Sequence, residues 1–380
     1  MKKVTSALIG VSLAASMALA SNVVKSTDGR GDFLIAPLYV AKGNVCTKVT
    51  VYNTNTTRSI LAKVAFREQT YSNEVDIPIF LSPGDVWTGK LCQQGSDVYL
   101  YSNDDSNHPQ AKAMLAKGVD ITSYSVKSGH TDVDFSTGYI EVYPIAEFNE
   151  RSDAKVAKSI LVNRWDSLIK GKYPSNTLKR VYNDLAGNVE YVDKNDPTPT
   201  SILPMTAFKN AHSKTLTGQV VAYGNDTNPY ILLGREKTTQ ILKILQHKTT
   251  TFTYSNYGKN QFIAFDFPFG YNHDQIRKFE IEVRDTKENK DVKKEVVIFS
   301  PAPKINKSNY MKNEVAIISV ADLISKTSNP KLFKEGQIQI KDITNVTDVQ
   351  FGPGKHASFI PTFFMITNNK ITNAHYIPTK

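Results

Sequence analysis

The feature that most constrains the fold is a series of short segments in which apolar and polar residues alternate. Alternation with a period of two is typical of β-strands that have one buried face. One such segment covers residues 45–51 and the next covers residues 62–67, where Lys63 and Arg67 are expected to point outward. The sequence Asn-Thr-Asn-Thr at residues 53–56 predicts the turn between them.

Further segments show the same alternation, or a short apolar run between turn residues. Pro78 lies inside residues 77–81, and since proline cannot donate a ladder hydrogen bond, we expect this strand at a sheet edge. Residues 82–85 (Ser-Pro-Gly-Asp) predict a tight turn after it. The other expected strands are 98–101, 121–126, 139–148, 218–223, 261–267, 279–284, 292–299, 314–320 and 337–341.

These patterns predict a mainly β protein built from immunoglobulin-like or Greek-key β-sandwich domains, with one or two short helices between them. A helical period appears over residues 153–170, and shorter helices are expected over 178–186, 238–247 and 321–326. The expected domains are a signal peptide (1–20), an N-terminal β-sandwich (21–150), a helical connector (151–200) and a C-terminal β-rich basic domain (201–380). One long interleaved β-sandwich fits the pattern equally well.

The first twenty residues indicate export. Lys2 and Lys3 precede an apolar run that ends Ala18-Leu19-Ala20, the pattern of a cleaved secretory signal peptide. The run is too short to span a bilayer, and no later segment supplies a long apolar stretch, so we expect no membrane span. The expected location is the cell surface or the extracellular space, and the periplasm also fits.

Cys46 and Cys92 are the two cysteines of the chain. In an oxidising compartment an even pair is typical of a disulfide, and no metal-ligand spacing competes with that interpretation. The bridge would close a loop of about 47 residues, worth up to roughly 4 kcal/mol in the chain-entropy description.

Charge is distributed unevenly along the chain. Residues 21–150 contain 11 Lys and Arg against 15 Asp and Glu, whereas residues 151–380 contain 33 against 21. This asymmetry favours self-association, or an anionic envelope polymer as the partner of the second half. A nucleic-acid partner is not expected for an exported protein. A basic surface without a specific partner would give the same counts.

Two kinds of candidate binding site appear in the sequence. Oxygen-rich loops suggest calcium, although no EF-hand spacing is present and such residues equally form turns; the candidate ligands are Asp104, Asp105, Asp193 and Asp196. Aromatic residues near a predicted turn suggest stacking on a sugar, although they equally suit a sandwich core; these are Trp87, Tyr99 and Tyr101.

Several elements spread along the sequence form a recognisable set. They are Gly31-Asp32-x-Leu34-Ile35-x-Pro37-x-Tyr39, Val51-x-Asn53-Thr54, Phe66-Arg67-Glu68, Ser72, Glu74, Leu81-Ser82-Pro83-x-Asp85-Val86-Trp87-Thr88, Gly138-Tyr139-Ile140-Glu141-Val142, Phe299-Ser300-Pro301 and Asn313-Glu314-Val315-x-x-Ile318. Together these elements resemble an uncharacterised family of exported proteobacterial surface or surface-layer-like proteins. The resemblance implies a location and carries no catalytic residue.

No GxSxG, HExxH or phosphate-loop pattern occurs in the sequence. We therefore expect a protein that is not an enzyme and that uses no cofactor other than the candidate calcium. An enzyme is the third alternative, because catalytic carboxylates that are far apart in sequence, for example Glu141 with Glu147 or Asp266, leave no local pattern. The expected function is that of an exported cell-surface or envelope structural protein that acts by assembly, as a surface-layer or matrix component. The alternative is a secreted binding module for envelope polysaccharide or a host surface.

Overall fold

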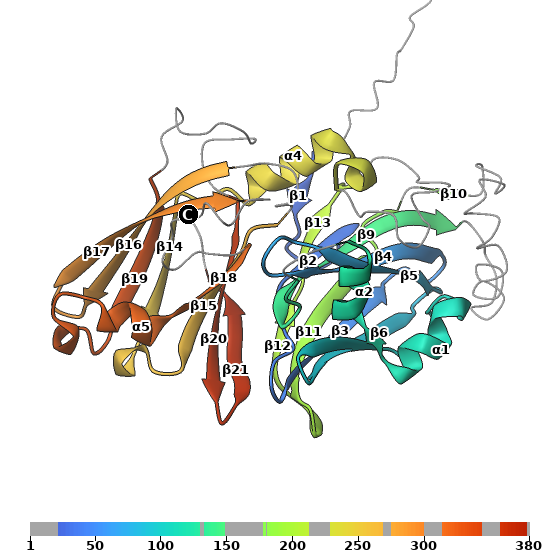
Figure 1. The fold of residues 1–380 in the computed structure, drawn as a ribbon. Helices are drawn as coiled ribbons and strands as arrows, with labels where there is room; N and C mark the ends of the chain where they lie inside the picture. Colours follow the sequence, from blue (N-terminus) through green and yellow to red (C-terminus); the bar gives the residue numbers. More distant parts are fainter. Residues whose placement is uncertain are drawn as a thin grey trace, which may run out of the picture.

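The computed structural model describes residues 22–129, 133–148, 178–179, 181–212, 229–268, 275–299, 314–343 and 358–377. Within these residues the protein is mainly β, as expected from the alternating segments. The strands form four sheets with antiparallel pairing, and short helices lie at their margins (Figure 1). The expected helix at 153–170 and the expected strand at 218–223 lie outside the described residues.

The first sheet has the strand order β1-β13-β2-β9-β4-β5, with β10 beside β9. Pro78 lies in β5, so the edge position that the proline predicted is confirmed. The strands are β1 (Val24–Lys25), β2 (Phe33–Val40), β4 (Ser59–Glu68), β5 (Glu74–Leu81), β9 (Thr137–Phe148), β10 (Leu178–Lys179) and β13 (Thr206–Lys209).

The second sheet has the strand order β12-β11-β3-β6-β7-β8 and packs against the first. Val49, Val64, Phe66 and Trp87 meet in the core between the two sheets, which together form the N-terminal sandwich. The strands of the second sheet are β3 (Val45–Asn53), β6 (Val86–Gln94), β7 (Asp97–Tyr101), β8 (Val119–Asp120), β11 (Leu185–Asp193) and β12 (Asp196–Pro204).

The third and fourth sheets, ordered β14-β19-β16-β17 and β18-β15-β20-β21, pack on each other through Phe252, Ile281, Phe265 and Phe363. The strands are β14 (Thr249–Tyr254), β15 (Gln261–Asp266), β16 (Gln275–Asp285), β17 (Lys290–Phe299), β18 (Val315–Ser319), β19 (Gly336–Asp342), β20 (Ile360–Thr367) and β21 (Lys370–Tyr376). This C-terminal pair lies beside the N-terminal sandwich (Figure 1).

The two pairs of sheets are joined along strands β12 and β21. The Thr200 hydroxyl donates to the Ile371 carbonyl at 2.6 Å, and the Ala374 amide donates to the Ser201 hydroxyl at 2.9 Å. The N-terminal core cluster also takes in apolar side chains of the fourth sheet, among them Phe364. The sandwiches therefore share a packed junction.

Among the described residues the α-helices are α1 (Pro109–Lys117), α2 (Ile121–Lys127), α4 (Arg235–Ile244) and α5 (Val320–Ser325). The last two confirm the helices expected near 238–247 and 321–326. Helix α1 and strands β11, β12, β13, β14, β20 and β21 were not predicted. The expected strand at 121–126 is wrong, because this segment is α2, whose first turn is capped by the Asp120 carboxylate accepting from the Ser123 amide at 2.9 Å.

The expected helix at 178–186 is also wrong, since its described parts enter strands β10 and β11. Strand β11 pairs with β3 over the whole of its length, and β12 and β13 follow it into the same two sheets. Sheet membership therefore places the division between the sandwiches after Lys209. The segment expected to be a helical connector contributes strands to the N-terminal sandwich.

Lys63 and Arg67 do lie on the face of β4 opposite the main core, but the expectation that this face meets solvent is wrong. Both side chains are at most 1% exposed. A second apolar cluster covers this face of the first sheet and includes Leu61 and Ala65 of β4 together with Ile241 of α4. The first sheet is therefore buried on both faces.

Candidate functional site

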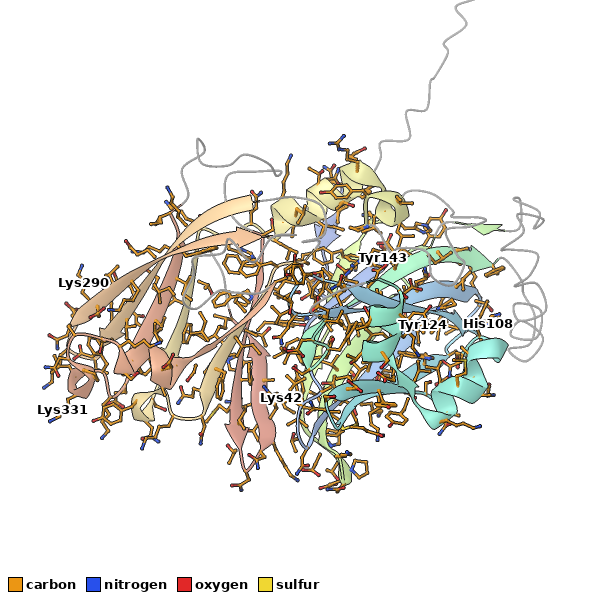
Figure 2. The ribbon with its side chains drawn as sticks, in the orientation of Figure 1. Lys42, His108, Tyr124, Tyr143, Lys290 and Lys331 are labelled. Atoms are coloured by element: carbon orange, nitrogen blue, oxygen red, sulfur yellow. A yellow bond between two sulfur atoms is a disulfide. The ribbon has the colours of Figure 1, made fainter. Side chains whose placement is uncertain are left out.

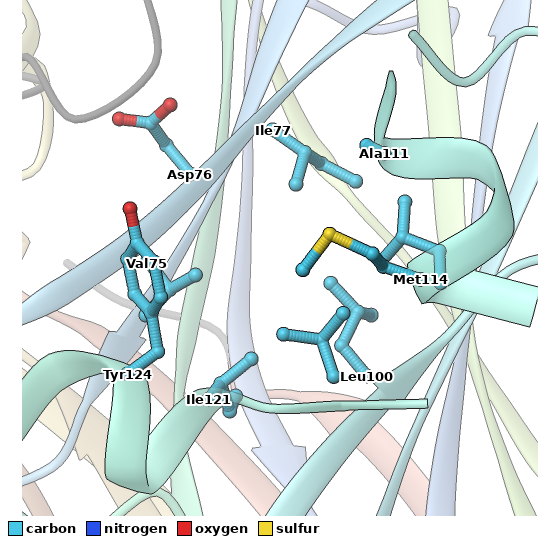
Figure 3. Close-up of a pocket in the computed structure, with 10 residues that line it drawn as sticks. Val75, Asp76, Ile77, Leu100, Ala111, Met114, Ile121 and Tyr124 are labelled. Carbon is cyan, nitrogen blue, oxygen red and sulfur yellow. The ribbon is translucent and has the colours of Figure 1, made fainter. Parts of the chain in front are cut away.

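An apolar pocket of about 340 Å³ opens at one edge of the N-terminal sandwich (Figure 3). It lies between β5, the edge strand of the first sheet, and strands β7 and β8 at the edge of the second. Val75 and Ile77 of β5 and Leu100 of β7 form the walls that come from the sheets. A hollow of this size and lining is within the range of small-molecule sites.

Helices α1 and α2 supply the other walls of the pocket. Ala111 and Leu115 are one turn apart on α1, so they face the pocket together. Gly118 has φ +93°, a left-handed conformation that ends α1 and turns the chain into β8. The Asp120 cap then starts α2, which places Ile121 and Tyr124 on the pocket.

The floor and the rim of the pocket differ in exposure. Leu115 and Ile121 are buried at the floor, whereas Met114 is 59% and Tyr124 is 45% exposed at the rim. The Asp76 carboxylate points away from the apolar side chains in Figure 3 and forms an ion pair with Lys63 at 3.0 Å. The interior is therefore an apolar space that opens at a flexible methionine and a tyrosine.

Trp87, expected as a sugar platform or a core residue, is a core residue. Its side chain is fully buried, and its indole Nε1 donates to Asn107 Oδ1 at 2.8 Å. The Asn107 amide donates in turn to the Ser102 hydroxyl at 2.9 Å. The indole ring therefore faces the sandwich interior.

Tyr99 and Tyr101 lie together on the outer face of β7. Their rings are stacked with centroids 6.3 Å apart, and Lys90 Nζ lies 5.9 Å from the Tyr101 ring centre. Both side chains are half-buried, so one side of the pair meets solvent. The structure thus brings together two of the three predicted aromatic residues.

The Cys46–Cys92 disulfide lies beside this aromatic pair. The two cysteines form the expected bridge between β3 and β6, with their Cα atoms 4.6 Å apart. They pack with Val192, and Tyr101 contacts the same small cluster. The bridge therefore supports the outer face of the second sheet on which the tyrosines lie.

The oxygen-rich loops use their carboxylates to form turns. Asp104 accepts from the Ser106 and Thr88 amides at 2.9 and 3.0 Å. Asp193 accepts from the Asn195 amide at 2.9 Å, and Asp196 accepts from the Thr198 amide at 3.0 Å. Within the described part of the chain, no three metal-ligand side chains gather at one point.

A network of buried charges on the outer face of the first sheet was not predicted. Arg67 of β4 forms ion pairs with Glu141 of β9 at 2.5 Å and Glu74 of β5 at 2.8 Å. The hydroxyl of Tyr143, which is labelled in Figure 2, donates to Glu141 at 2.7 Å. The sequence gives little indication of this network, because each charged residue occupies a polar position of an alternating strand. Such positions usually face water.

This network continues across the junction to the C-terminal sheets. Asp266 at the end of β15 and Glu314 just before β18 are fully or almost fully buried. Burial raises the pKa of the Glu314 carboxyl to about 8 and holds the pKa of Asp266 well above its ordinary value; the nearby Glu141 raises both pKa values further. Burial therefore favours the protonated form of both carboxyls in the folded protein.

A second hollow of about 480 Å³ lies between the edge strands of the C-terminal sheets. Polar side chains contribute much of its surface, including Thr251, Gln261 and Asn373, and Met365 is also at this site. The polar lining of this second hollow distinguishes it from the apolar pocket of the N-terminal sandwich.

No protein-family model matches the chain, and neither the curated proteins nor the solved structures contain a match. Among the described residues, no helix is long and apolar enough to cross a membrane.

Proposed function

We propose that this chain is an exported cell-surface or envelope protein that acts by association, and that the apolar pocket of the N-terminal sandwich is the part that engages its partner. The observation that carries the proposal is the opening of this pocket at the sandwich edge, with Met114 and Tyr124 exposed at its rim. Exposed apolar surface next to a hollow is typical of a binding site. The predicted signal peptide and the disulfide support an exported location.

The test combines localisation with a variant that fills the pocket. Native cells are fractionated, with and without protease treatment of intact cells, and the protein is quantified by mass spectrometry. Ala111→Phe places a ring at the pocket, whereas Ala113→Phe adds the same ring at an exposed position of the same helix. We expect envelope association to fall for the first variant alone; equal association of both variants and wild type would contradict the proposal.

The partner in this association can be a second copy of the chain, as in a surface layer or matrix. The opposite net charges of residues 21–150 and 151–380 support that form of the proposal. Sedimentation velocity of the purified protein at low and moderate salt tests it. Larger species that dissociate as salt is added are expected, and a monomer at every salt and protein concentration would exclude self-assembly.

A second candidate function is the binding of envelope polysaccharide or a host glycan. It is supported by the stacked, half-exposed rings of Tyr99 and Tyr101, with Lys90 beside them, since sugars stack on such aromatic faces. A glycan array with wild type, Tyr99→Ala and Tyr101→Ala tests it, with Tyr257→Ala as the matched control at a distant exposed tyrosine. Binding that is equal in all four proteins would exclude this surface.

A further inference from the structure

We propose that the pocket between β5, β7, α1 and α2 binds the hydrocarbon chain of a single-chain anionic amphiphile, such as a fatty acid. This inference rests on the proposed function, because it names the chemistry of the partner that the pocket engages.

The volume and lining of the pocket fit one linear chain. An apolar cavity of ~150 Å³ stays dry and holds a six-carbon benzene ring, so a pocket of about 340 Å³ has room for roughly a dozen carbons by the same ratio. Its interior is formed by aliphatic side chains from both sheets, including Val75, Ile77 and Leu100. A hydrocarbon chain gains free energy from each methylene that leaves water here, whereas a sugar would leave its hydroxyl groups unpaired.

The rim of the pocket is suited to an anionic head group. Lys117 follows Met114 by three positions on α1, and Lys127 follows Tyr124 by three positions on α2. Residues three apart are neighbours on a helix surface, so each exposed lysine lies next to a rim residue. These lysines place positive charge beside the rim, within a half of the chain that is otherwise net acidic. The Asp76 carboxylate, the acidic group among the lining residues, points away and is paired with Lys63.

Met114 provides an adaptable closure for such a ligand. Its unbranched thioether is flexible and is 59% exposed in this structure, so it can fold over a chain of variable shape without steric cost. The bound chain would in turn cover the exposed side of Met114. The terminal methyl group of this residue is therefore a direct reporter of occupancy.

The first experiment titrates the exported chain with sodium dodecanoate below its micelle concentration and follows the methionine methyl signals by NMR. Met114 is expected to shift, while the buried Met205 and the Met365 of the second hollow are expected not to shift. Affinity should rise about fourfold for each added methylene from octanoate onward, and should level off near twelve carbons. A shift at Met365 alone, or an affinity that does not depend on chain length, would overturn the proposal.

Two sets of variants separate the chain from the head group. Ala111→Phe should weaken dodecanoate binding by at least about tenfold because it fills space that methylenes occupy, whereas Ala113→Phe should bind as wild type. The double variant Lys117→Glu and Lys127→Glu should weaken dodecanoate about three- to tenfold and leave the neutral dodecanol unaffected. Denaturant midpoints close to wild type confirm that each variant is folded. If the Ala111→Phe variant is not folded by this criterion, the NMR titration of the wild-type protein alone tests the proposal.

A final experiment distinguishes binding of a free amphiphile from binding of a membrane lipid. Vesicles of phosphatidylcholine and phosphatidylglycerol are sedimented with the protein in the presence and absence of dodecanoate. Binding of dodecanoate without vesicle binding, or vesicle binding that dodecanoate displaces, supports the proposal. Vesicle binding that dodecanoate does not displace, with no shift of Met114, overturns it. Envelope association that persists without any dodecanoate binding overturns this inference while the proposed function stands.

Discussion

Ser72 and Glu314 are 242 residues apart in the sequence, yet the Ser72 hydroxyl donates a hydrogen bond to the Glu314 carboxyl group. Ser72 lies in the turn between β4 and β5 of the N-terminal sandwich, and Glu314 immediately precedes β18 of the C-terminal sheets. The Ser72 hydroxyl is also 2.7 Å from the Tyr139 hydroxyl. A buried polar contact of this kind fixes how the two sandwiches meet, because a shifted junction would leave its groups unpaired.

The buried carboxyl groups at this junction predict that stability falls as pH rises. The pKa of Glu314 is raised from its ordinary 4.5 to about 8. Between these values the folded state keeps a proton that the unfolded chain has released, so the stabilisation is complete below pH 4.5 and is lost as pH approaches 8. For this one proton the free energy of unfolding should decrease by about 1.4 kcal/mol per pH unit within the window.

Denaturant unfolding of wild type and Glu314→Gln at pH 5 and pH 8 measures this effect. The glutamine does not titrate, so the variant should show a smaller decrease; the remainder comes from Asp266 and Glu68, buried carboxyls of the same site whose pKa values are also raised. The same pH dependence in both proteins would show that Glu314 titrates normally.

Arg67 should be among the most sensitive positions of the first sheet. Arg67→Met leaves Glu74 and Glu141 buried without their cation, and the loss of one partner of a buried pair costs about 3–5 kcal/mol. Arg30→Met is the control, because Arg30 pairs with Asp28 at the surface, where such pairs contribute less than about 1 kcal/mol. Comparable midpoints for the two variants in chemical denaturation would contradict the role assigned to Arg67.

Reduction of the disulfide should destabilise the N-terminal sandwich. The bridge joins cysteines 46 residues apart, and closing a loop of that length is worth up to about 4 kcal/mol. The double variant Cys46→Ala and Cys92→Ala should have the same unfolding midpoint as the protein in reductant, and a midpoint unchanged by either treatment would exclude a stabilising bridge.

Gly89 should not tolerate alanine, because of the position of the Trp87 ring. A Cβ atom at residue 89 would lie 2.5 Å from Trp87 Cη2 and 2.9 Å from Cζ2. Trp87 is buried and held by Asn107, so Gly89→Ala should cost about 1–3 kcal/mol through overpacking. In a Trp165→Phe background, the fluorescence emission of Trp87 should also change when Gly89→Ala is introduced. If neither the emission nor the free energy of unfolding changes, the Trp87 ring has room to move.

The sequence by itself determined the elements whose signal is local. Alternating residues such as Val49 and Val51 marked a strand, Pro78 marked an edge, and residues 82–85 marked a turn, because backbone sterics and the two-residue period act between near neighbours. The pairing of Cys46 with Cys92 also followed from their number and the expected compartment. Residues 121–126 show the limit of this reasoning, since an apolar and β-branched composition was overridden by the Asp120 cap and by packing of Ile121.

Only the tertiary structure decided which polar positions are buried and where the sandwich stays open. Lys63 and Arg67 have the sequence pattern of outward residues, yet both are buried, and Arg67 lies close to Asp266 and Glu314, which are about 200 and 250 residues further along the chain. The pocket likewise depends on how the edges of two sheets and two helices, all between residues 75 and 124, are placed around one space. Both are relations between separate elements, and the alternation within any one strand is the same whether its polar face meets water, a carboxylate or a second layer.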